Sequence, residues 1–63
     1  MSKPNIIKYF RYEHLPPHLK KVSKPFSDVA EFMVETLPDN EEREVALRKL
    51  LESKDAAVRA RVE

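Results

Sequence analysis

Cysteine and glycine are both absent from this chain of 63 residues, and each absence excludes a class of chemistry. Without cysteine there is no disulfide framework and no thiolate that could bind a metal or attack a substrate. Phosphate-cradling loops of the Walker and dinucleotide types need glycine where the backbone approaches the phosphate. We therefore expect any nucleotide to be held by side chains and helix ends.

Long apolar runs are missing as well. No stretch approaches the roughly 20 apolar residues that a membrane span needs, so no membrane partner is expected. The first residues, Met-Ser-Lys-Pro-Asn, lack the apolar core of a signal peptide. Together these features predict a cytoplasmic protein.

The small size of the chain limits its core. We expect one domain over residues 1–63, and a domain of this size buries a modest fraction of its surface. Disulfides, a metal or a partner subunit usually supply the missing stability. His14 and His18 are four apart, but Pro16 and Pro17 separate them and no nearby carboxylates complete the three or four ligands of a zinc site. With no metal or other cofactor expected, self-association is the remaining support.

Charge is unevenly distributed although the net charge is only +1. Residues 1–25 contain six Lys or Arg against Glu13 alone, whereas residues 26–46 contain seven acids and only Arg43. The basic end could hold an anion or dock on the acidic middle of another copy. The alternative is an unevenly charged, solvated surface. A pI near 8.1 and the acidic middle disfavour nucleic acid, although aromatic and basic residues alternate around residues 8–12.

The apolar pattern predicts two helices joined by a short turn, which is an antiparallel helical hairpin of the all-α class. A short N-terminal arm or helical turn occupies residues 1–13, helix 1 about 16–36, the turn 37–40 and helix 2 about 40–61. Helix 1 has an apolar stripe at Leu15, Leu19, Val22, Phe26, Val29, Met33 and Leu37. The stripe keeps its phase across Pro25, which favours one kinked helix; the alternative is a break at that position.

Helix 2 has a clear start and a mixed inner face. Pro38 moves Leu37 out of the helical conformation, and Asp39 with Glu42 matches a capping-box pattern. The expected buried stripe consists of Leu47, Leu50, Leu51, Ala57 and Val58. Arg43, Lys54 and Arg61 fall on or beside it. They either extend along the surface to water or mark a place where several subunits meet around an anion.

No catalytic constellation is recognisable. The serines lack a glycine elbow, and neither histidine lies in the setting of a base–nucleophile pair. The carboxylates are explained by capping and by surface ion pairs. We therefore expect a binding protein rather than an enzyme.

Several segments resemble a phage-borne family of small helical hairpins, similar to the anti-CBASS cyclic-nucleotide sponges and related to the hairpin of anti-Thoeris sponges. The matching stretches are FRYEHLPPHL (10–19), VSKPF (22–26), LPD (37–39), ER (42–43) and VALRKLLESKDAAVRA (45–60). The resemblance implies a homo-oligomer, in the best-known sponges a hexamer built as a dimer of trimers. It also implies binding of cyclic di- or trinucleotide immune signals in the cytoplasm of the infected bacterium, without cleavage.

The resemblance also implies ligand contacts. The tyrosine that contacts cyclic dinucleotides between two protomers matches Tyr12, and the lysine falls on Ser23 or Lys24, of which Lys24 supplies charge. The pattern Arg-Glu-x-Ala-Leu matches Arg43 at a second, axial site for cyclic trinucleotides. The threonine that follows in the sponges is absent here. Lys49 and Lys54 are further candidate ligand contacts. The alternative function is a small helical adaptor that binds a protein and no nucleotide.

Overall fold

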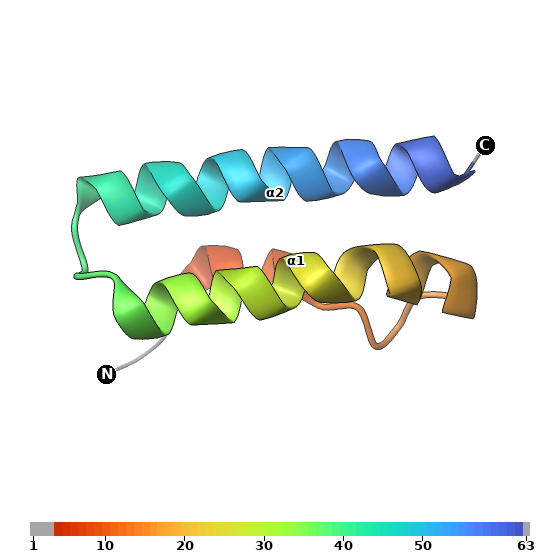
Figure 1. Cartoon of the computed structure of the whole chain (residues 1–63), viewed down its shortest axis with the longest axis horizontal. Coiled ribbons are helices and arrows are strands. Elements are labelled where there is room, and N and C mark those ends of the chain that lie inside the picture. The colour runs from red at the N-terminus through yellow and green to blue at the C-terminus, as the bar shows by residue number, and fades with distance from the viewer. Residues whose placement is uncertain (1–3, 63) are drawn as a thin grey trace.

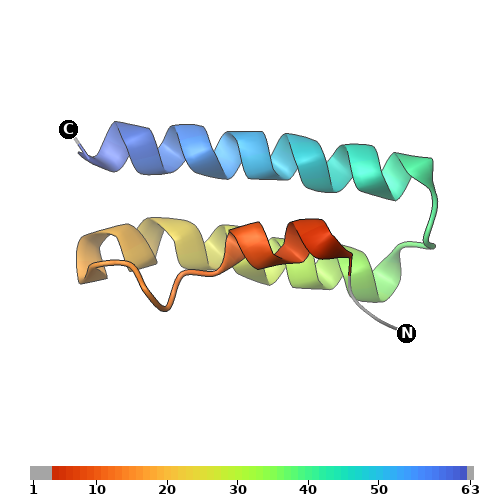
Figure 2. The same cartoon turned by 180° about the vertical axis from the view of Figure 1, so that it is seen from behind.

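The computed structural model describes residues 4–62 as three helical elements in the order η1, α1 and α2. The 3₁₀ helix η1 spans Asn5–Phe10, and the α-helices α1 and α2 span Pro17–Thr36 and Glu41–Val62. The two long helices run antiparallel, and η1 lies along α1 on one side of the hairpin (Figures 1 and 2). The described part of the chain contains no strand. The expected all-α helical hairpin is thus observed.

Prolines explain both ends of α1. Pro16 is extended and Pro17 is the first helical residue, where a missing N–H has no cost. At the other end Leu37 is extended, with φ −96° and ψ 144°, because the ring of Pro38 disfavours a helical conformation before it. Pro25 lies inside α1, so the helix is continuous and the alternative of a break is wrong.

The cap of α2 differs from the expectation. The side-chain Oδ1 of Asn40 accepts a hydrogen bond of 2.9 Å from the backbone N–H of Arg43. Asn40 therefore caps the helix, and the cap predicted at Asp39 is wrong by one residue. The carboxylate of Asp39 instead pairs with the guanidinium of Arg43. The first turn still carries Glu41, Glu42 and Glu44, which suits the positive end of the helix dipole.

The N-terminal arm docks on the hairpin of its own chain. Residues 1–3 of the predicted arm lie outside the described residues, and Asn5–Phe10 forms η1. The Phe10 side chain at the end of η1 is only 1% exposed. From Phe10 the chain runs through a loop to the open end of the hairpin, where α1 begins (Figure 2).

The core is small and draws on all three elements. Phe10, Ala30 and Leu47 are buried. Seven partly buried residues pack against them: Ile6, Ile7, Phe26, Met33, Val34, Leu50 and Leu51. The predicted α2 stripe is confirmed as buried or partly buried. In the predicted stripe of helix 1, however, Val29 and Leu37 are exposed, whereas the small side chains of Ser23 and Ala30 on α1 are buried. Their size permits close approach of the neighbouring backbone.

Among residues 4–62 no residue has a positive φ and no peptide bond is cis. The turn between Thr36 and Glu41 therefore closes without a left-handed residue, which agrees with the absence of glycine. The molecule measures 36 × 18 × 16 Å along its principal axes. None of the helices in the described part of the chain has the length and apolar character needed to cross a bilayer.

Candidate functional site

Tyr12 and Lys24 lie side by side although they are distant in sequence. Tyr12 is half-buried in the loop between η1 and α1, and Lys24 is exposed on the second turn of α1. The Lys24 Nζ is 6.0 Å from the centroid of the Tyr12 ring, at the outer limit of a cation–π contact. The loop therefore places an aromatic ring and a cation together at the surface.

Asp28 completes this surface cluster. Its carboxylate lies 3.0 Å from the Lys24 Nζ, one helical turn further along α1. The hydrogen bond to Asp28, the charge of Asp28 and a smaller influence of Tyr12 raise the pKa of Lys24 above its ordinary value. Lys24 is therefore fully charged at neutral pH. Both partners are exposed, so the ion pair adds little to stability and can open to admit another anion.

Ser23, the alternative to Lys24, is buried. Its side chain is fully inaccessible, and its Oγ has no hydrogen-bond partner among the described residues. It shares a face of α1 with Ala30, seven residues later, and that face points into the molecule. Of the two residues left open by the sequence, only Lys24 can meet a ligand at the surface of this chain.

Arg43 is occupied by the turn of the hairpin. Its guanidinium lies 3.0 Å from Asp39 Oδ1 and donates a long hydrogen bond of 3.5 Å to the Val34 carbonyl oxygen. In a regular helix that carbonyl would accept the N–H four residues later, but residue 38 is a proline and has none. Arg43 thus replaces a donor that Pro38 removes. With only 9% of the residue exposed, Arg43 has a structural role here.

The two remaining candidates lie on α2. Lys49 is exposed, with its Nζ 3.9 Å from Glu52. Lys54 is largely buried, and its Nζ donates a hydrogen bond of 2.8 Å to the Tyr9 carbonyl oxygen and pairs with Asp55 at 3.2 Å. Lys54 therefore joins η1 to α2. The structure brings Tyr12 and Lys24 together; it does not bring them together with Arg43, which is engaged at the turn.

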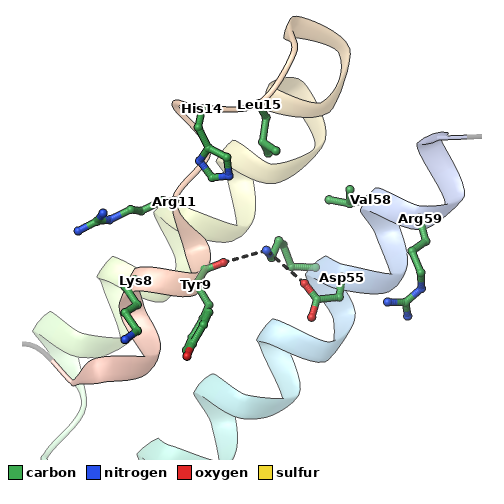
Figure 3. Close-up of a pocket in the computed structure, with 9 residues that line it drawn as sticks. Lys8, Tyr9, Arg11, His14, Leu15, Asp55, Val58 and Arg59 are labelled. Carbon is green, nitrogen blue, oxygen red and sulfur yellow. Dashed lines mark hydrogen bonds and ion pairs between the residues drawn. The ribbon is translucent and has the colours of Figure 1, made fainter.

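A pocket of about 440 Å³ lies between the η1 end of the chain and α2 (Figure 3). It is lined by Lys8, Tyr9, Arg11, His14, Leu15, Lys54, Asp55, Val58 and Arg59. Apart from Lys54, the predicted site contained none of these residues. The alternation of aromatic and basic residues near residue 9 indicated the first three, but spacing alone could not reveal that the C-terminal half of α2 faces them.

The described surface offers a ring, cations and no recognisable catalytic group. Within residues 4–62, no three His, Cys, Asp or Glu side chains are grouped closely enough to hold a metal ion. A ring beside cations is suited to stacking and to contacts with anions. Comparison with protein-family models, with curated proteins and with solved structures finds no match to this chain.

Proposed function

We propose that the chain binds cyclic oligonucleotide signals and sequesters them without cleavage. The observation that carries this proposal is the placement of the Lys24 Nζ 6.0 Å from the Tyr12 ring at the surface. A nucleotide base stacks on an aromatic ring with a gain of about 1–3 kcal/mol, and a lysine ammonium is a point charge suited to phosphate. The pair supplies both contacts within one small area.

Two copies of this pair match a cyclic dinucleotide. Such a ligand has two bases and two phosphates, whereas one copy of the chain offers one Tyr12 ring and one Lys24 ammonium. A ligand between two protomers would meet each contact twice. The competing carboxylate of Asp28, 3.0 Å from the Lys24 Nζ, is displaced by phosphate at little cost because the ion pair is exposed.

The proposed function includes a homo-oligomer, such as a trimer-based hexamer. Phe32 is 63% exposed and Val29 is 43% exposed on α1. These are large apolar side chains to leave uncovered when only three hydrophobic residues between 4 and 62 are buried. Lys24, Asp28 and Phe32 are spaced four apart and lie along one side of α1. A second copy packed over Phe32 would border the Tyr12–Lys24 pair. This relationship favours a ligand site at the edge of a subunit interface.

The proposal rests on Tyr12 and Lys24 and not on an axial site. An axial ligand would require Arg43 to leave Asp39 and the Val34 carbonyl. Sequestration would take place in the bacterial cytoplasm during phage infection, where such signals activate immune effectors.

Titration calorimetry against a panel of cyclic di- and trinucleotides tests this function, with the oligomer mass measured by light scattering on the same sample. Tyr12→Ala should weaken binding by about tenfold or more, whereas Tyr12→Phe keeps the ring and should retain binding. Lys24→Ala should weaken binding, and Lys20→Ala, which changes another exposed lysine of α1, serves as the control. No heat with any member of the panel, from a folded sample, would falsify the proposal.

The second candidate function is a protein-interaction adaptor, and the exposed Phe32 and Val29 favour it. In that case Phe32→Ser would abolish capture of a protein partner, and no cyclic nucleotide would bind at any oligomeric state. If the chain instead sequesters cyclic nucleotides, the same substitution lowers the oligomer mass and weakens nucleotide binding. The two measurements separate the candidates.

A further inference from the structure

The pocket between η1, the following loop and α2 carries a strong excess of positive charge. Lys8, Arg11, Lys54 and Arg59 line it against the single carboxylate of Asp55. That carboxylate is paired with Lys54 at 3.2 Å. The positive charges come from three segments, which are η1, the loop after it and α2. The fold brings these segments together around one pocket.

The cations are arranged around the pocket rather than at one point. Figure 3 shows Arg11 and Arg59 on opposite sides of the pocket, with the Arg11 side chain extending away from α2 and His14 beside the loop. The Lys54 ammonium has three N–H groups; it donates one hydrogen bond to the Tyr9 carbonyl oxygen and forms an ion pair with Asp55. One N–H of this pocket-lining lysine therefore remains for an anion. The rim arginines have planar guanidinium groups, which match phosphate with two parallel hydrogen bonds.

The pocket also offers an aromatic ring and an apolar wall. Tyr9 is 56% exposed, and the Lys8 Nζ lies 5.3 Å from its ring centroid. Leu15 and Val58 line the pocket from the loop and from α2. A volume of about 440 Å³ falls within the range of about 300–1,000 Å³ that is usual for small-molecule sites. A ligand of this size could bring both a phosphate and a ring system.

We infer that this pocket is a second binding site, which takes a nucleoside monophosphate. Lys54 binds the phosphate from the wall of the pocket, the long side chains of Arg11 and Arg59 turn toward it from opposite rims, and the base lies against Tyr9. Tyr12 and Lys24 are not among the lining residues, so the site is separate from the proposed cyclic-nucleotide site and does not depend on it. A simple inorganic anion would leave the ring and the apolar wall unused.

An NMR titration of the isotopically labelled full chain with AMP at low ionic strength tests the inference. Backbone signals of residues lining the pocket should shift, and the shifts should saturate. Arg11→Gln and Arg59→Gln should each lower the affinity for AMP by about tenfold, which is the loss expected for one charge-assisted hydrogen bond. Arg48→Gln removes an exposed arginine of α2 outside the pocket and should leave the affinity unchanged.

Three further titrations identify the contacts. Tyr12→Ala should leave AMP binding unchanged, and a loss in this variant would overturn the inference because it would place AMP at the other site. Inorganic phosphate should bind at least about tenfold more weakly than AMP, because a stacked base contributes at least about that factor; equal affinity would overturn the role of Tyr9. Adenosine should not bind. The site would be refuted if AMP caused no saturable shifts in the backbone signals of the pocket residues. It would also be refuted if Arg48→Gln lowered the affinity for AMP as much as Arg11→Gln and Arg59→Gln do.

Discussion

The Lys54 ammonium donates a hydrogen bond of 2.8 Å to the Tyr9 carbonyl oxygen across 45 positions of sequence. This contact fastens η1 to α2, and it also forms one wall of the basic pocket. Only 13% of the Lys54 side chain is exposed, although the hydrogen bond itself lies at an exposed position because Tyr9 is largely exposed. The position of the N-terminal segment therefore depends on a residue near the other end of the chain.

Replacement of Lys54 should loosen η1. Lys54→Met keeps most of the aliphatic stem and removes the ammonium, which leaves the Tyr9 carbonyl without its side-chain donor. We expect a loss of about 1 kcal/mol in the free energy of unfolding, measured by urea denaturation. Lys49→Met changes an exposed lysine of the same helix and should cost less than about 0.5 kcal/mol. Equal effects of the two substitutions would contradict the role of the Tyr9 contact.

Phe10 should be among the most sensitive positions of the chain. Its side chain is 1% exposed and joins the core to η1, so Phe10→Ala leaves a cavity and costs about 3–5 kcal/mol. A small domain has total stability of that order, and the variant should be largely unfolded by circular dichroism at room temperature. Tyr9→Ala, next to it but exposed, should keep the helical spectrum. A well-folded Phe10→Ala variant would show that η1 contributes little to the core.

The start of α2 gives a test of its cap. Asn40→Ala removes the acceptor of the Arg43 N–H and should destabilise the protein by about 1 kcal/mol. Asp39→Ala removes only an ion pair whose carboxylate side is 70% exposed, and a loss below about 0.5 kcal/mol is expected. The reverse order of the two losses in thermal melts would restore Asp39 as the cap.

Asp28 should act as a competitor of anions at Lys24. Asp28→Asn removes the main cause of the raised Lys24 pKa, so NMR titration should show that pKa falling toward its ordinary value. Any cyclic nucleotide that binds the wild-type protein should bind this variant a few-fold more tightly, because phosphate no longer displaces a carboxylate. Unchanged affinity together with a lowered pKa would place the ligand away from Lys24.

The same pKa sets a pH dependence. A raised lysine pKa means that the charged form persists above the ordinary lysine range, so wild-type anion binding at Lys24 should be level through neutral pH and decline as pH rises through the raised value. In Asp28→Asn the decline should begin at lower pH. Because Lys24 is exposed, the stability of the fold should not follow this titration.

Local rules predicted the helices well because prolines and apolar spacing act over a few residues. Pro17 and Pro38 determine the ends of α1 through backbone sterics alone. The burial of Phe10 was beyond such rules, since a 3₁₀ helix of six residues is too short for a periodic pattern. The contact between Arg43 and the Val34 carbonyl could not be predicted either. That carbonyl lacks a helical donor because Pro38 has no N–H, and the turn then brings Arg43 close to it.

The candidate site divides in the same way. The resemblance named Tyr12 and Lys24 as contacts of one ligand between two protomers. The structure shows that the two residues of one chain lie close together, through a loop that no periodicity describes. The choice between Ser23 and Lys24 depends on which face of α1 packs against the rest of the molecule, because neighbouring helical residues point about 100° apart. The sequence alone did not determine that face. The pocket around Lys54 required knowledge of where η1 docks, which depends on contacts between the two ends of the chain.

The turn that closes without a left-handed residue has a consequence for which substitutions this chain tolerates. On backbone grounds, no described position needs the one amino acid that lacks a Cβ. Apart from the prolines that bound α1, a substitution in the described hairpin is therefore limited by the contacts of the new side chain and not by an unusual backbone conformation. We therefore expect substitutions at exposed helical positions, other than those to glycine or proline, to preserve the fold.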